Sequence, residues 1–406
     1  MPRTVHLMAL GIFAMVTSEF LVGGLMPQIS ADLGVSIARV GYLITAFGLA
    51  MAVGGPIAAT ALMRLAPKTA LLVLFAVFIA GNALAAAAPG YPVMLAARVI
   101  TGAASGAFFG VAVTAVIRLV PEGMRGRATG AAMQGLMVGT LLGLPLSTLL
   151  GGLWGWRAAF AAVGVLAAAV ALAVLAFMPP LAPAEDAGGP REEAAVFRRP
   201  RLLVALLGST FIIGATFSAF SYFAPILTEV TGFSEGAVPV LLLVYGAASV
   251  VGNAVVARFA QSHTRTAIAI GLALNALFLA GFALFAGAKA PAVAAMIGIG
   301  LVGVTLNPAM AMRVHRAGNA RALVNTVHSS FITLGVVLGS WFGGMAIDAY
   351  GLRAAPWIGV ALAAAGLLTL VPDRLRDRGG RSGKGAAPGG APEAAGPAEP
   401  VGAQGA

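Results

Sequence analysis

Twelve long apolar runs constrain this chain more than any other feature of its sequence. A helix that crosses a bilayer needs about 20 mostly apolar residues, and charged residues, prolines and glycines divide the sequence into runs of that length. The composition agrees, because 59% of the residues are hydrophobic and only 10% are charged. The sequence therefore predicts an all-α polytopic membrane protein and argues against a soluble enzyme. The predicted spans are residues 5–27, 39–62, 69–88, 91–118, 127–150, 157–178, 202–228, 236–259, 266–287, 290–312, 322–346 and 351–371.

The spans fall into two groups of six, separated by a charged segment rich in proline and glycine. The chain ends in a stretch of Gly, Ala and Pro, a composition that cannot bury a core. We therefore expect an N-terminal six-helix half at 1–178, a cytoplasmic linker at 179–201, a C-terminal six-helix half at 202–371 and a disordered cytoplasmic tail at 372–406.

The basic residues predict how the chain is oriented. If the N-terminus is cytoplasmic, twenty Lys and Arg residues fall in cytoplasmic segments, and only Arg39, Arg157, Lys289 and Arg353 fall in outer loops. Cytoplasmic loops of membrane proteins carry such an excess of Lys and Arg. We expect a multi-pass protein of the cytoplasmic membrane with both termini in the cytoplasm. The net charge of +11 then reflects loops in contact with lipid, and it gives no sign of nucleic-acid binding.

The two groups of spans repeat the same landmarks at a nearly constant offset. Five residues recur 198 positions later and three glycines of the fifth span recur 200 positions later, in the same order. Chance matches among many glycines are the alternative. Duplicated halves with a substrate path between them are a transporter architecture. The first members of the pairs are Pro27, Gly34, Ser36, Gly48 and Gly54, followed by Gly135, Gly139 and Gly143.

Three short motifs carry a resemblance to a known family: Thr17-Ser18-Glu19-Phe20, Arg98-Val99-Ile100-Thr101-Gly102 and Gly139-x-x-x-Gly143-x-Pro145. Together they resemble the major facilitator superfamily, and within it the twelve-helix drug:proton antiporters of the arabinose-efflux and chloramphenicol-exporter type. The resemblance implies two pseudo-symmetric six-helix halves and a monomer without a cofactor. It also implies export of a small apolar or amphipathic compound in exchange for protons.

Glu19 and Arg98 are the charged residues that fall inside predicted spans. At 1.5 Å per residue, both lie roughly 10 to 12 Å below the outer surface. Charged residues at such depth are rare and face a cavity or a partner. We predict that Glu19 is the proton carrier and that Arg98 acts on it. A static ion pair that joins two helices is the alternative.

Candidates for the substrate cavity come from the repeat and from the resemblance. The offset of 198 pairs Glu19 with Phe217 and Arg98 with Met296, which gives the second half an apolar surface. Ser218, Tyr222 and Asn307 are neutral polar candidates on the seventh and tenth spans. Plain packing is the alternative for Phe217 and Met296, and hydrogen bonding between helices is the alternative for the polar residues.

The resemblance also predicts residues that act in conformational change. Gly135, Gly139 and Gly143 form a small-residue stripe followed by Pro145, and the resemblance places this stripe at the interface of the halves. Packing alone would produce the same stripe. The loop after the second span lacks the Asp that is usual in the family. Gly55, Arg64 and Lys68 are therefore the remaining candidates for the cytoplasmic gate.

Two other functions stay open at this point. A proton-coupled importer of a small nutrient would share the fold. A polytopic membrane enzyme would need a cluster of acidic or histidine side chains inside the membrane. The sequence does not predict a metal site, because it has no cysteine and its four histidines are scattered. We also find no nucleotide-binding loop of the Gly-x-x-x-x-Gly-Lys-Ser/Thr type.

Overall fold

A computed structural model describes residues 2–62, 64–181, 195–260, 262–318 and 322–371, and helices dominate these residues. Among them, eleven helices are long and apolar enough to cross a membrane, and the apolar helix α16 is shorter. These twelve elements follow the order of the predicted spans, and the all-α fold is confirmed. The linker residues 182–194 and the tail residues 372–406 lie outside the described residues, so the predictions for them stay predictions.

The first six spans are built from seven α-helices and two irregular turns. The second span contains a π-helical turn between α2 and α3. The elements are α1 (Arg3–Leu33), α2 (Ile37–Leu49), η1 (Ala50–Gly54), α3 (Gly55–Leu62), α4 (Pro67–Ala86), α5 (Tyr91–Arg118), η2 (Glu122–Met124), α6 (Arg125–Trp154) and α7 (Trp156–Phe177).

The second six spans follow the same order but with more interruptions. The tenth span breaks into a 3-10 turn between α13 and α14. The elements are η3 (Ala195–Arg198), α9 (Pro200–Phe220), α10 (Phe223–Pro225), η4 (Ile226–Val230), η5 (Glu235–Ala237), α11 (Val238–Phe259), α12 (Thr264–Phe285), α13 (Lys289–Val302), η6 (Val304–Leu306), α14 (Asn307–Ala317), α15 (Ala322–Tyr350) and α16 (Ala354–Leu368).

Four glycines with positive φ end helices at corresponding turns of the two halves. Gly34 after α1 has φ 63° and Gly232 has φ 74°, while Gly155 after α6 and Gly351 after α15 both have φ 81°. Residues with a Cβ rarely adopt this conformation. The repeat seen in the sequence is therefore present in the backbone of the turns.

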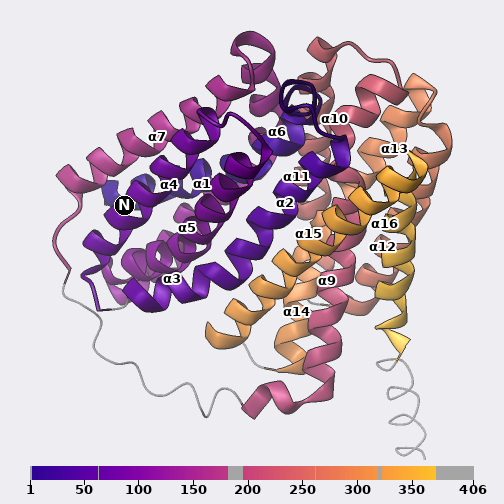
Figure 1. Ribbon diagram of the computed structural model, residues 1–406. Coiled ribbons are helices and arrows are strands. Elements are labelled where there is room, and N and C mark those ends of the chain that lie inside the picture. The colour runs from indigo at the N-terminus through magenta and orange to yellow at the C-terminus, as the bar shows by residue number, and fades with distance from the viewer. Residues whose placement is uncertain (1, 63, 182–194, 261, 319–321, 372–406) are drawn as a thin grey trace, which may run out of the picture.

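The two sets of helices lie side by side and contact each other along α2 and α15 (Figure 1). Thr45 and Ser340 share a hydrogen bond of 2.9 Å, and the rings of Tyr42 and Trp341 are 4.8 Å apart. These residues belong to the part of α2 that lies at the end of the bundle away from the linker. Further along the second span, Ile57 is 66% exposed. The halves are therefore closed against each other on the side away from the linker.

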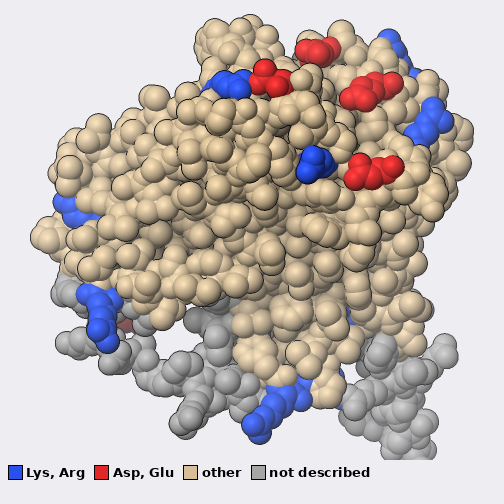
Figure 2. Space-filling view, viewed as in Figure 1, with Lys and Arg blue, Asp and Glu red and all other residues tan. Residues whose placement is uncertain are grey.

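Charged side chains gather at the two ends of the molecule and leave a broad uncharged belt between them (Figure 2). Many large apolar side chains are exposed on the surface of the chain, including Leu153 at 63% and Val165 at 70%. Apolar surface of this extent is costly in water but suits lipid. The belt is the surface expected of a protein that spans a membrane.

Candidate functional site

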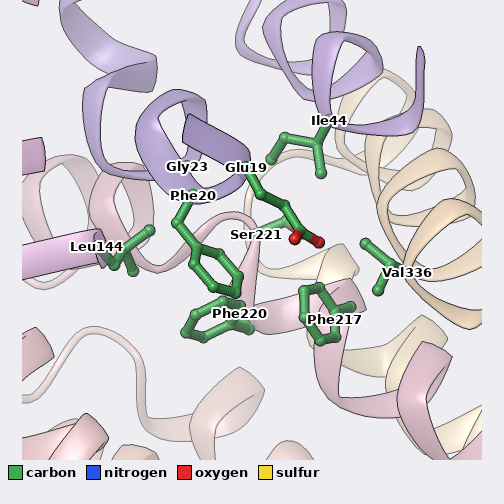
Figure 3. A pocket seen from close by; sticks show the side chains of 9 residues that line it. All are labelled: Glu19, Phe20, Gly23, Ile44, Leu144, Phe217, Phe220, Ser221 and Val336. Atoms are coloured by element: carbon green, nitrogen blue, oxygen red, sulfur yellow. The ribbon is translucent and has the colours of Figure 1, made fainter. Parts of the chain in front are cut away.

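Glu19 points into a small pocket that both halves line (Figure 3). The pocket has about 10 Å³ of free space, enough for one water molecule. Apolar and aromatic side chains form most of its wall. The lining residues are Glu19, Phe20 and Gly23 of α1, Ile44 of α2, Leu144 of α6, Phe217 and Phe220 of α9, Ser221 directly after α9, and Val336 of α15.

The carboxylate of Glu19 interacts electrostatically with the nearby Arg98 but does not bind it directly. Within the described residues it makes no hydrogen bond and no salt bridge. The neighbouring residues on α1, Ser18 and Phe20, are buried. An unpaired charge in such surroundings is costly. The site therefore has one acidic group that can take a proton or face a ligand, in a wall that is otherwise almost entirely apolar.

Arg98 is fully buried on α5 and binds the backbone of α1. Its guanidinium donates one hydrogen bond of 2.8 Å to the carbonyl oxygen of Ser18 and another of 3.2 Å to that of Glu19. It also lies over the ring of Phe47, 4.2 Å from the centroid. These groups hold the guanidinium, and in the described chain it makes no salt bridge with the Glu19 carboxylate, although the two charges interact. The alternative of a static ion pair stays a prediction.

A buried asparagine braces the same turn of α1. The hydroxyl of Ser18 donates to Asn82 Oδ1 of α4 at 3.1 Å, and the Asn82 amide donates to the carbonyl oxygen of Phe78 at 2.9 Å. The position of Glu19 is therefore fixed from two neighbouring helices, α4 and α5. Sequence reasoning missed Asn82, although a lone amide inside the third predicted span was a usable signal.

Three phenylalanines join the halves next to Glu19. The Phe20 ring of α1 stacks on Phe217 with centroids 6.4 Å apart and meets Phe220 edge-on at 5.6 Å. Phe217 and Phe220 contact each other at 5.2 Å. The sequence predicted a cavity role for Phe217 alone. Phe220 follows Phe217 by three residues, a spacing that places both rings on one face of a helix. This spacing was a usable signal for Phe220.

The other predicted cavity residues do not line this pocket. The Tyr222 hydroxyl donates to the carbonyl oxygen of Ser340 at 2.6 Å, and the Ser218 hydroxyl donates to that of Ala215. Met296 is fully buried, and Asn307 at the start of α14 is exposed. A role for these four residues in substrate binding stays a prediction.

The glycine stripe of α6 packs within its own half, so its expected place at the interface of the halves is wrong. A Cβ at Gly135 would lie 1.9 Å from the carbonyl oxygen of Ala9, and one at Gly139 would lie 2.8 Å from Val16. Gly143 faces Phe20. All three therefore allow α1 and α6 to pack closely. The matching stripe of α15 packs on α9 in the same way.

Pro145 lies two residues beyond this stripe and is buried inside α6. Because proline has no N–H, the carbonyl oxygen of Leu141 lacks its usual helical partner. That carbonyl lies against Gly246 of α11, where the two halves meet. Pro145 therefore shapes the contact between α6 and α11, and its part in conformational change stays a prediction.

Similarity to known proteins identifies the family of this chain. The model of the Major Facilitator Superfamily matches residues 8–329. The chain belongs to the Major Facilitator Superfamily. This confirms the resemblance that the motifs around Glu19 and Arg98 carry.

Several members of the superfamily are similar over most of their length. A chloramphenicol resistance protein of Streptomyces lividans is 38% identical over 274 residues, which cover 66% of this chain and 70% of that protein. The inner membrane transport protein YdhP of Escherichia coli K12 is 31% identical over 363 residues, 89% of this chain and 93% of YdhP. A probable sugar efflux transporter of Helicobacter pylori is 29% identical over 371 residues, 90% of this chain and 93% of that protein.

Solved structures of the superfamily share the fold. A bacterial homolog of the human lysosomal transporter Spinster, inward-facing and unoccupied, aligns with a TM-score of 0.76 at 17% identity over 90% of this chain and 95% of that chain. A D-xylose-proton symporter aligns with a TM-score of 0.69 at 17% identity over 90% of this chain and 96% of that chain. Family and fold are thus those of superfamily transporters and not of enzymes.

The predicted gate residues of this superfamily member lie at the linker end of the first half. Lys68 donates to the carbonyl oxygens of Leu175 and Met178 at 2.8 and 2.7 Å, which closes the end of α7. Arg64 is exposed, and Gly55 lies against Gly106 of α5. These contacts stay within one half, so gating by Gly55, Arg64 and Lys68 remains a prediction.

Proposed function

We propose that this protein is a proton-coupled antiporter that exports a small apolar or amphipathic compound across the cytoplasmic membrane. The observation that carries the proposal is the carboxylate of Glu19, which makes no hydrogen bond or salt bridge in the described chain and points into an aromatic pocket lined by both halves. Proton and substrate compete for this one acidic group. Because the pocket lies between the halves, its shape changes whenever they move against each other.

The walls of the pocket support the substrate class. Phe20, Phe217 and Phe220 offer apolar ring faces, and no hydrogen-bonding array for a sugar lines the closed pocket. Its free space of about 10 Å³ is too small for such a compound, so the substrate enters only when the halves separate on the linker side. The relatives named for chloramphenicol resistance and sugar efflux support the direction, which is export.

In this proposal the role of Arg98 is to position Glu19. By binding the carbonyl oxygens of Ser18 and Glu19, it fixes the turn of α1 that carries the carboxylate. Its positive charge lowers the cost of a carboxylate nearby. We further propose that the linker side is cytoplasmic, because the basic residues concentrate there, and that the protein acts as a monomer.

Export by inverted membrane vesicles tests the proposal, with chloramphenicol as the first probe and a panel of other antibiotics as the second. In such vesicles respiration acidifies the interior, and an exporter should concentrate the drug there. We expect Glu19→Gln to reduce accumulation at least tenfold, because the amide resembles the protonated acid and cannot exchange its proton. Glu122→Gln is the matched control, since Glu122 is 88% exposed in η2.

Two results would contradict the proposal. If Glu19→Gln still concentrates substrate under a proton gradient alone, Glu19 is not the carrier. If acidification of the interior drives the drug out of the vesicles instead, the protein is an importer.

A further inference from the structure

A second and larger cavity lies between the halves near the outer turns. It has about 250 Å³ of free space, against about 10 Å³ in the pocket at Glu19. Ends of α1 and α6 form one side of it, and α10, η4, η5 and the start of α11 form the other. The two pockets have different lining residues, so this cavity is distinct from the proposed transport site.

The contact between α6 and α11 beside the cavity has a counterpart in the internal repeat, the contact between α2 and α15. In that counterpart the rings of Tyr42 and Trp341 are 4.8 Å apart. The offsets of 198 and 200 residues place Val240 and Leu141 at the equivalent positions of α11 and α6. Two aliphatic side chains replace two aromatic ones, and Val240 is 61% exposed. The two interfaces therefore differ in side chains, although neither Val240 nor Leu141 itself lines the cavity.

The polar atoms of the cavity mainly accept hydrogen bonds. Thr148 and Thr228 both donate their hydroxyl hydrogens to backbone carbonyl oxygens of the preceding turn, so their oxygens are left as acceptors. The Glu235 carboxylate is an acceptor only and makes no salt bridge within the described chain. Gln28 adds an amide, which can donate or accept. Such a lining favours a ligand that donates hydrogen bonds and carries positive charge.

The rim of the cavity is apolar and lies next to an exposed tryptophan at the end of α6. Leu149 and Leu153 line the cavity and are 47% and 63% exposed. The next residue, Trp154, is 68% exposed at the outer end of α6. Exposed tryptophans at helix ends are typical of the membrane–water boundary. The cavity therefore offers acceptors and a carboxylate beside a surface that suits a hydrocarbon chain.

We propose that this cavity binds an amphiphile that carries an amine, with the ammonium group at Glu235 and the hydrocarbon chain along Leu149 and Leu153. Two sources share this chemistry: the ethanolamine headgroup of a phospholipid in the outer leaflet, and a free single-chain amine. The site is independent of proton coupling at Glu19.

Native mass spectrometry of the purified full-length protein tests the proposal. The probes are phosphatidylethanolamine, phosphatidylglycerol with the same acyl chains, dodecylamine and dodecanol. We expect one amine-bearing probe to bind per protein molecule, with at least fivefold preference over its anionic or neutral counterpart. Retention of phosphatidylethanolamine alone identifies the lipid as the ligand, whereas retention of dodecylamine identifies a free amine.

Three variants locate the binding. A Cβ at Gly152 meets no atom within 4 Å, so Gly152→Phe fills the cavity without a backbone clash and should weaken binding at least tenfold. Glu235→Gln should weaken it about two- to fivefold, since an exposed ion pair contributes little. Glu235→Lys should reverse the preference toward phosphatidylglycerol. Gly130→Phe is the matched control on the same helix, because its Cβ also meets no atom within 4 Å and it does not line the cavity.

Equal binding of the amine-bearing probes and their counterparts would overturn the proposal, as would unchanged binding by Gly152→Phe and both Glu235 variants. The Glu235 variants are exposed substitutions, so they decide the question even if Gly152→Phe does not fold. Glu19→Gln should bind these probes as the wild type does. The proposed function and the cavity can thus fail separately.

Discussion

At the scale of single residues, the buried arginine is the most constrained side chain of the site. Arg98 reaches two carbonyl oxygens on consecutive residues of α1 and covers the ring of Phe47 at the same time. Only a planar group with several donors can make all three contacts. The side chain thus fixes the backbone that presents Glu19.

We expect Arg98→Lys to lower the stability of the protein, although it keeps the charge. The lysine side chain is shorter and its ammonium has no planar face to lie over the Phe47 ring, so we expect it to lose at least one of the contacts of Arg98, at a cost of about 1.5–3 kcal/mol. Thermal unfolding of the protein in detergent measures this cost. Arg258→Lys is the control, because Arg258 is exposed at the end of α11 and should unfold at the wild-type temperature. Equal unfolding temperatures for both variants would contradict the role given to Arg98.

At the scale of elements, α1 and α6 form the closest pair of helices in the first half. Their contact depends on the glycines of α6, since backbone atoms of α1 occupy the space that side chains would need. Small residues allow such approach, and packing then replaces the hydrophobic effect as the force between helices in lipid.

Two substitutions of the same kind on α6 should have opposite effects. Gly135→Ala places a Cβ 1.9 Å from the carbonyl oxygen of Ala9 and should cost about 1–3 kcal/mol. Gly130→Ala meets no atom within 4 Å and should stabilise the helix by about 0.5–1 kcal/mol. Chemical or thermal unfolding in detergent compares them. A stable Gly135→Ala variant would show that α1 and α6 are further apart.

The elements could be predicted from the sequence to a large extent, and the contacts of the site only in part. Apolar runs of about 20 residues fix the spans because lipid leaves few alternatives. Rotation of each helix about its axis is harder to predict, since residues facing lipid are as apolar as those in the core. For that reason the sequence could not show that Tyr222 is buried against α15, or that Arg98 binds backbone carbonyls and not the Glu19 side chain.

At the scale of the whole molecule, the halves are closed along α2 and α15, on the side away from the linker. Thr45 and Ser340 mark this closure, because their hydroxyl oxygens are 2.9 Å apart. Export by alternating access requires this interface to open. A bond across it should therefore stop the cycle without disturbing either half.

The natural chain contains no cysteine, so a designed pair is free of competing thiols. In a Thr45→Cys/Ser340→Cys variant the sulfur atoms would occupy the positions of the two hydroxyls, close to the bond length of about 2 Å. We expect oxidation to abolish transport in vesicles and reduction to restore it. Each single variant should be insensitive to oxidation. Full transport by the oxidised pair would show that this interface stays closed throughout the cycle.

The positive-φ glycines at the outer turns bear on the ancestry of the chain. A turn that only glycine adopts readily tolerates few substitutions, so a duplicated chain is expected to keep glycines such as Gly34 and Gly232 where neighbouring side chains differ. No such restraint acts on Glu19 and Phe217, which the offset pairs with each other. The turns of the two halves are therefore symmetric, whereas the paired positions 19 and 217 hold a carboxylate and an aromatic ring.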